Sequence, residues 1–126
     1  MIDAYPCPCC GYLVFDEAPG SYDICPICFW EDDVAQLRFP LMAWGPNRVS
    51  LIEAQQNFRR VGAAEERNLP HVRSPNASDV LDPEWRPVNP GRDSFEEVGA
   101  SNAAETYPKD ATVLYYWRPT FWRRAV

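Results

Sequence analysis

Short apolar stretches recur along the whole chain, and polar or proline-containing turns separate them. Residues 12–15 are aromatic and β-branched, which is typical of a short strand. The alternation of Tyr22 and Ile24 around Asp23 indicates a second strand with one solvent-facing side. Turn-forming residues at 16–21 lie between the two stretches. The pattern therefore predicts a β-hairpin in which residues 12–15 pair with residues 22–24.

One amphipathic helix is predicted in the middle of the chain. Ser50 followed three residues later by Glu53 has the spacing of a capping box, and Gly62 is typical of a helix end. The helix is expected to run from Leu51 to about Arg60. Its predicted buried face consists of four apolar residues: Leu51, Ala54, Phe58 and Val61.

Prolines and glycines interrupt the other apolar residues, so regular elements there should be short. Residues 36–44 predict an irregular apolar crossing, and residues 63–90 predict a loop that follows the surface. Residues 93–98 are expected to form one or two helical turns. Residues 112–117 have the β-branched and aromatic composition of a strand, which resumes at 120–122 after a proline.

Two Cys-x-x-Cys motifs near the N-terminus change this picture. Fourteen residues lie between the last cysteine of the first motif, Cys10, and the first cysteine of the second, Cys25. This spacing is typical of four-thiolate zinc sites. Proline after the first cysteine of each motif presets the turn, and Gly11 permits a positive φ where the chain doubles back. Zinc is the expected occupant of such a cage, with iron as the alternative. The predicted ligands are Cys7, Cys10, Cys25 and Cys28.

Other uses of the cysteines fit less well. Disulfides need an oxidising compartment, and the first residues lack the pattern of a secretion signal. A thioredoxin-like redox pair needs a βαβ setting, which the pattern does not provide. The fifth cysteine, Cys9, falls outside the ligand spacing; it is either a small apolar residue or a spare thiolate able to exchange with Cys10.

The predicted fold class is small α+β, with an N-terminal zinc-ribbon hairpin, one amphipathic helix and a loop-rich remainder ending in an aromatic strand. At 126 residues the chain is expected to be a single domain over 1–126. Residues 1–62 would hold the ribbon and the helix, and residues 63–126 the loop-rich extension. No apolar run approaches the ~20 residues of a membrane span, so we expect a soluble, cytoplasmic protein.

Charge is unevenly distributed along the chain. The net charge is −6, and residues 1–50 hold two basic and seven acidic residues, or −5. A four-thiolate zinc centre would add a further −2, which favours a basic partner over nucleic acid. The acidic triplet Glu31, Asp32 and Asp33 is interpreted either as a solvated face or as a contact surface for that partner. Phe29 and Trp30, just before it, are expected to cover the metal site.

The C-terminal segment mixes aromatic residues with arginines, here Trp117 and Trp122 with Arg118, Arg123 and Arg124. Three interpretations remain open: an edge strand packed into the core, a protein interface, or a surface that stacks on nucleic-acid bases.

No catalytic motif is evident. His71 is the only histidine, it has no matching acid–base partner in the sequence, and four thiolates would close the coordination sphere of a zinc ion. We therefore expect no enzymatic activity.

Residues 7–12 together with residues 25–33 resemble the bacterial cysteine-rich CPCC family, and the resemblance continues weakly through 45–54 and 57–58. It implies a zinc-ribbon-like metal-binding domain rather than an activity. Similar small bacterial proteins accompany polymorphic toxins as immunity partners. The knuckles are also similar to those of rubredoxin, but the loop between them is much shorter and no glycine follows Cys28.

The sequence thus predicts a non-enzymatic, zinc-binding protein-interaction module, for example an immunity or inhibitor protein that binds a basic toxin. The alternatives are a rubredoxin-like iron electron-transfer protein and a nucleic-acid-binding zinc ribbon.

Overall fold

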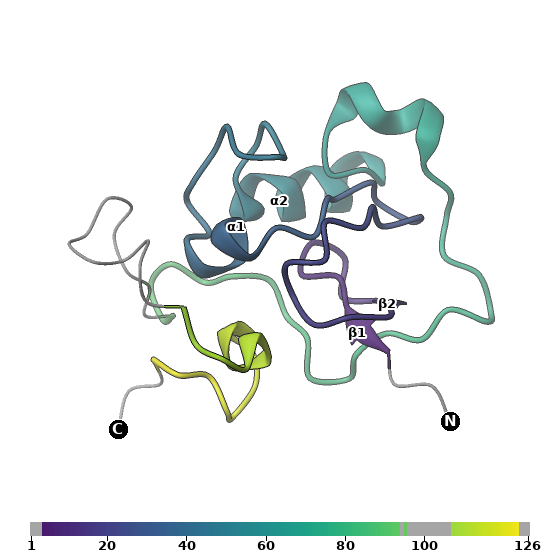
Figure 1. The fold of residues 1–126 in the computed structure, drawn as a ribbon. Coiled ribbons are helices and arrows are strands. Elements are labelled where there is room, and N and C mark those ends of the chain that lie inside the picture. Colours follow the sequence, from purple (N-terminus) through teal and green to yellow (C-terminus); the bar gives the residue numbers. More distant parts are fainter. Residues whose placement is uncertain (1–3, 94, 96–106, 124–126) are drawn as a thin grey trace.

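The computed structural model describes residues 4–93, 95 and 107–123. Its regular elements are all short, and irregular segments connect them (Figure 1). In chain order they are β1 (Tyr5–Pro6), β2 (Leu13–Phe15), α1 (Val34–Arg38), α2 (Leu51–Val61), and the 3-10 helices η1 (Glu66–His71) and η2 (Ala111–Leu114). None of the helices within these ranges is long and apolar enough to cross a membrane.

The two strands form an antiparallel hairpin, but its partners differ from the prediction. β2 pairs with β1 across the first cysteine motif, with Tyr5 opposite Phe15 and Pro6 opposite Leu13. Residues 22–24 pair instead with residues 31–32, which lie across the second motif. Each cysteine motif reverses the chain and so brings together the two segments that flank it. These segments pair with each other because the loop between them is short.

The predicted helix is confirmed as α2. The Ser50 side chain accepts a hydrogen bond from the N–H of Glu53, and Gly62 ends the helix in the left-handed conformation at φ 89°. Leu51 and Ala54 are buried as expected, whereas Phe58 and Val61 are only half-buried. Gln55 is buried beside them, which the apolar pattern did not predict.

The prediction for residues 36–44 was wrong for the first three of them, and the strand predicted at 112–117 was wrong. The segment predicted as an irregular crossing begins inside the short helix α1, whose first turn is capped by Asp33. Residues 112–117 form no strand: the segment enters η2 and then turns, burying Tyr115, Tyr116 and Trp117. Of the expected turns at 93–98, residues 94 and 96–98 lie outside the described residues.

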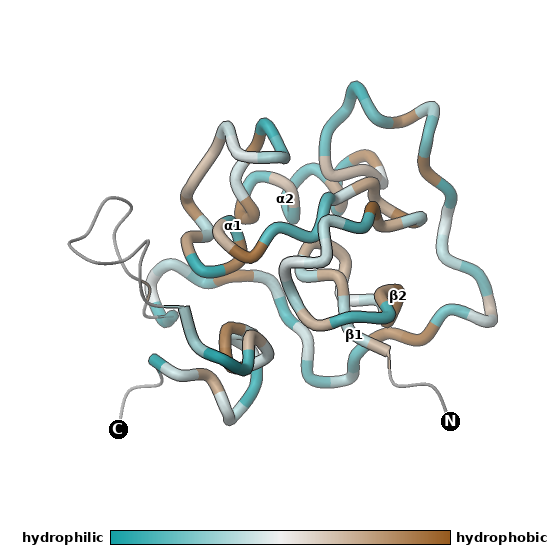
Figure 2. The backbone as a smooth tube through the Cα atoms, in the orientation of Figure 1, coloured by the Kyte–Doolittle hydropathy of each residue, from teal (hydrophilic) through white to brown (hydrophobic). Residues whose placement is uncertain are grey.

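The core is assembled from these short pieces around the cysteines. Figure 2 shows that the chain alternates between apolar and polar positions within a few residues nearly everywhere. The buried cluster includes all five cysteines together with residues from every part of the described chain, among them Phe15, Ile27, Trp30, Leu37, Leu51, Leu114 and Tyr115. A core so small and so interrupted is the kind that a metal ion stabilises.

The segment after η1 completes the fold. As far as residue 93 it runs down one side of the molecule, passes the β1–β2 hairpin and crosses toward the side on which η2 lies (Figure 1). Along the way Leu13 donates its N–H to Val80 O at 2.8 Å, and Tyr12 forms an isolated bridge with Leu81. This extension therefore contacts the side of the hairpin that carries the first cysteine motif.

Candidate metal centre

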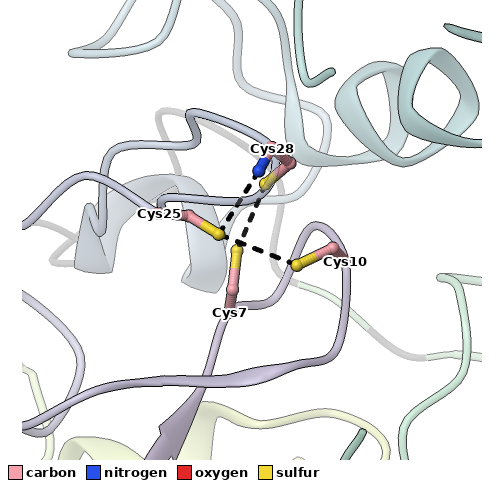
Figure 3. Close-up of side chains that lie close together, drawn as sticks. All are labelled: Cys7, Cys10, Cys25 and Cys28. Atoms are coloured by element: carbon pink, nitrogen blue, oxygen red, sulfur yellow. Dashed lines mark hydrogen bonds between the residues drawn. The ribbon is translucent and has the colours of Figure 1, made fainter. Parts of the chain in front are cut away.

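The first cysteine motif is a tight knuckle closed by its own backbone. The N–H of Gly11 donates to Cys7 O at 2.7 Å, and the N–H of Cys7 donates to Tyr12 O at 2.9 Å. Gly11 has a φ of 84°, which is the left-handed conformation predicted for it. The turn brings the side chains of Cys7 and Cys10 to the same side of the loop (Figure 3).

The second motif repeats this geometry. Phe29 donates its N–H to Cys25 O at 2.9 Å, and Cys25 donates its N–H to Trp30 O at 2.9 Å. Phe29 takes the place that Gly11 has in the first knuckle and adopts φ 70°. Although no glycine follows Cys28, the chain makes the same turn because Phe29 accepts the left-handed conformation that large side chains rarely adopt.

The four outer cysteines meet at one point. Cys7 Sγ lies 3.6 Å from Cys28 Sγ, and Cys10 Sγ lies 3.8 Å from Cys25 Sγ (Figure 3). All four sulfur atoms lie within 4.8 Å of one another, and all four residues are buried. A tetrahedral site with bonds of about 2.3 Å requires sulfur atoms about 3.8 Å apart. The four cysteines can therefore hold a single metal ion.

Burial and hydrogen bonds act in different directions on the ionisation of these cysteines. Burial is the main cause that raises the pKa of Cys7 and Cys28, because an apolar setting disfavours thiolates. Hydrogen bonds from the neighbouring thiols lower the pKa of Cys25, whose sulfur also accepts from the N–H groups of Ile27 at 3.4 Å and of Cys28 at 3.5 Å. All four cysteines could be thiolates here only if a bound cation compensated their charge.

Cys9 lies outside this group, as its spacing predicted. It is fully buried within the core cluster, and burial is the main cause that raises the pKa of its thiol. This agrees with the interpretation of Cys9 as a small apolar residue.

The aromatic residues after the second knuckle have separate roles. Trp30 is fully buried in the core beside the cysteines. Phe29 is half-buried, and its ring stacks on that of His71, with centroids 5.1 Å apart. The histidine thus packs η1 against the second knuckle.

The first knuckle is covered by a side chain from the C-terminal extension, Trp85. No local signal in the sequence indicated this contact. The indole N–H of Trp85 and the side-chain amide of Gln55 both donate to Pro8 O at 3.0 Å. The Trp85 ring lies flat against Gly11, so closely that a Cβ atom on that glycine would be 2.6 Å from the ring. Gly11 is therefore needed for two reasons, its backbone conformation and the ring above it.

Buried polar groups fasten this cover. The Gln55 side chain donates to Tyr116 Oη at 2.9 Å and accepts from the N–H of Val88 at 2.9 Å. The Tyr116 hydroxyl in turn donates to Arg86 O. One residue of α2 thus connects the first knuckle with two separate parts of the extension.

Asp82 is the second anchor of the extension. Its backbone N–H donates to Gly11 O at 2.8 Å, and its carboxylate accepts from the Trp117 indole and the Arg118 guanidinium, both at 3.0 Å. Burial opposes ionisation of Asp82, but these bonds and one from the N–H of Glu84 outweigh it and lower its pKa. Asp82 therefore connects Trp117 and the partly buried Arg118 to the first knuckle.

The acidic triplet does not form one solvated face, which corrects that interpretation for two of its members. Asp32 accepts a hydrogen bond from Ser21 Oγ at 2.7 Å, and Asp33 accepts from the N–H of Gln36 at 2.8 Å as the cap of α1. Both carboxylates are buried, and burial raises the pKa of Asp32 to about 6. Glu31 remains partly exposed, and its contact with a partner stays a prediction.

Three of the C-terminal arginines and tryptophans, Trp117, Arg118 and Trp122, make contacts within the fold. Trp117 and Arg118 bind Asp82, and the Trp122 ring lies 4.9 Å from the buried guanidinium of Arg38. Arg123 is exposed, and Arg124 lies outside the described residues. Trp117 is therefore buried as the core interpretation predicted, although not in an edge strand, and Arg118 is partly buried beside Asp82.

Comparison with known proteins agrees with this geometry. No curated protein matches the chain. The model of a family described as cysteine-rich CPCC matches residues 5–79, a range that includes both knuckles, α1, α2 and η1. Trp85, Asp82 and the aromatic residues of the C-terminal segment lie beyond the matched range. The chain belongs to the cysteine-rich CPCC family.

Proposed function

We propose that this protein is a non-enzymatic interaction module that one zinc ion stabilises and that binds a basic protein partner, for example a toxin that it inhibits. The observation that carries the proposal is the closed cage of four buried cysteine sulfurs. Four thiolates fill a tetrahedral coordination sphere and leave no position for a substrate or a reactive water, which is the arrangement of structural zinc sites.

Zinc is the default ion of a closed four-thiolate site, and iron is the alternative. Tetrahedral four-sulfur sites suit either metal. All four cysteines are at most 2% exposed, and such dry surroundings suit a structural ion. An iron-loaded protein would be coloured and would transfer electrons, so the visible absorption spectrum separates the two candidates.

A basic partner is favoured by the distribution of charge. The chain has a net charge of −6, and its first 37 residues contain no lysine or arginine. The first cation, Arg38, is buried. A zinc ion bound by four thiolates would add −2 to this half of the molecule, so complementary charge would speed association with a basic protein.

Affinity capture tests the proposal. The zinc-loaded protein, immobilised through its C-terminus, is exposed to a lysate of the source organism in which the neighbouring genes are co-expressed. We expect it to retain a basic protein that binds again after purification, with an affinity that falls as salt increases. Loss of binding after zinc removal is also expected, because the fold depends on the ion. Failure to retain any protein would refute the interaction role.

A further inference from the structure

The loop between α1 and α2 exposes two large apolar side chains, Leu41 and Trp44. Leu41 is 69% exposed and Trp44 is 79% exposed, the highest values among the large apolar side chains within the described ranges. The loop rises away from the two helices in Figure 1. Tryptophan dominates the binding energy of many protein interfaces, and its exposure in a small protein needs an explanation.

Two buried amides hold this loop rigidly from beneath. The Gln36 side chain is fully buried, and its NH2 group lies 3.0–3.1 Å from the carbonyl oxygens of Met42, Asn47 and Val49. Its carbonyl oxygen accepts from the backbone and side-chain N–H groups of Asn47. Gly45 lies directly on the Gln36 amide, so a Cβ atom there would be 3.0 Å from it. The exposed apolar tip is therefore presented on a fixed backbone.

The backbone beneath the most exposed aromatic residues is also unusual. Trp44 has φ 64°, and Tyr22, which is 57% exposed, has φ 63°. Large side chains rarely adopt this left-handed conformation. Phe29 also does so, but it closes a metal knuckle and packs on His71. The N–H groups of Trp44 and Tyr22 also donate within the fold, to Arg48 O at 3.1 Å and to Asp32 O at 3.0 Å. Their side chains, unlike that of Phe29, are exposed, and backbone strain of this kind clusters at functional sites.

Hydrogen bonds connect the two strained sites through an acidic residue. The N–H of Glu31 donates to Asn47 Oδ1, and the Asn47 amide donates back to Glu31 O, both at 2.9 Å. On its other side Glu31 pairs with Ile24, which is 40% exposed and lies two residues after Tyr22. Asp23, between those two residues, is exposed. Acidic side chains thus accompany exposed apolar ones along this part of the molecule.

We propose that Tyr22, Ile24, Glu31, Leu41 and Trp44 form the surface that contacts a partner protein, and we name it the Trp44 surface. This inference rests on the proposed function and specifies its site. The partner it fits has an apolar pocket for Trp44 with lysines or arginines at its rim. Charge complementarity supports that choice, because Arg48 is the one exposed cation among residues 4–48.

The test uses a displayed library of random peptides selected against the zinc-loaded protein. Selected peptides are synthesised, and their affinities are measured for the wild type and for the variants Trp44→Gly and Leu41→Ala. The control for Leu41→Ala is Leu69→Ala, which truncates a leucine that is 40% exposed on η1. Glycine at position 44 relieves the left-handed strain, so Trp44→Gly should melt at the same temperature as the wild type or higher.

We expect selected peptides to combine basic residues with large apolar ones and to bind Trp44→Gly at least tenfold more weakly, with Leu69→Ala unchanged. Peptides that bind Trp44→Gly as tightly as the wild type would overturn this surface while leaving the proposed function standing. Selection of no peptide at all would count against the interaction role itself. A concentration-dependent dimer lost in Trp44→Gly would assign the surface to a second copy of the chain and overturn the choice of a basic partner.

Discussion

Alanine at Gly11 should destabilise the protein far more than alanine at Gly62, although both glycines have nearly the same backbone conformation. Gly11 has φ 84° and lies under the Trp85 ring, whereas Gly62 has φ 89° and nothing within 4 Å of the position of a Cβ atom. At Gly62 the substitution should cost only the left-handed conformation of a non-glycine residue, about 1 kcal/mol. Gly62→Ala is therefore a matched control.

At Gly11 two further costs arise. The Cβ atom would lie 2.6 Å from the Trp85 ring, so the ring must move; such overpacking costs about 1–2 kcal/mol. Moving the ring also weakens its hydrogen bond to Pro8 O, which contributes about 1 kcal/mol. Gly11→Ala should thus lower the free energy of unfolding by about 3–4 kcal/mol in total, roughly 2–3 kcal/mol more than Gly62→Ala.

The assay is urea unfolding of the metal-loaded proteins at one fixed concentration of free zinc, because bound metal contributes to the measured stability. Gly11→Ala in a Trp85→Ala background completes a double-mutant cycle. There the cost of Gly11→Ala should fall to about 1 kcal/mol, since no ring remains to be displaced. Equal costs for Gly11→Ala and Gly62→Ala in the wild-type background would refute the role of Trp85 as the cover of the first knuckle.

Three other substitutions test separate parts of the structure. Cys25→Ser should abolish tight metal binding and leave the chain largely unfolded by circular dichroism, because metal binding and folding are coupled in small sites; an unchanged melting temperature would contradict this. Asp32 has a pKa raised from 3.8 to about 6 by burial, so the folded state binds its proton more tightly than the unfolded state and loses stability as pH rises through this window. Asp32→Asn should therefore stabilise the protein by about 1–2 kcal/mol near pH 7 and by clearly less near pH 5; a pH-independent difference in unfolding free energy would contradict the assignment. Asp82→Ala should cost about 3 kcal/mol, because it removes the acceptor of the buried Trp117 indole and of the partly buried Arg118 guanidinium. Asp79→Ala, which breaks a more exposed ion pair, should cost much less; similar losses in thermal unfolding would be inconsistent with an anchoring role for Asp82.

The four-cysteine cluster and α2 could be predicted because their signals are local. Cysteine spacing, Ser50 before the helix and Gly62 after it each specify a conformation within a few residues. A similar signal was present for α1: Asp33 stands three residues before Gln36, the spacing of a cap followed by a glutamine. It was missed because a five-residue helix has too short an apolar pattern to recognise.

The C-terminal segment could not be predicted in the same way. Its β-branched and aromatic residues indicate burial, and burial is what the structure provides for Tyr115 and Trp117. The expected strand does not form because the segment is fixed by side-chain bonds to Asp82 and Gln55, residues far away along the sequence. Trp85 illustrates the same difficulty, since only the folded chain brings it over Gly11.

The metal content of the purified protein tests the central claim most directly. Elemental analysis by mass spectrometry, with the intact mass measured under native conditions, should give one zinc ion per chain in a colourless sample, held by Cys7, Cys10, Cys25 and Cys28. The same measurement on Cys25→Ser should give little or no zinc. Iron with visible absorption would contradict the structural zinc site in favour of electron transfer, and a folded chain free of any metal would contradict the account as a whole.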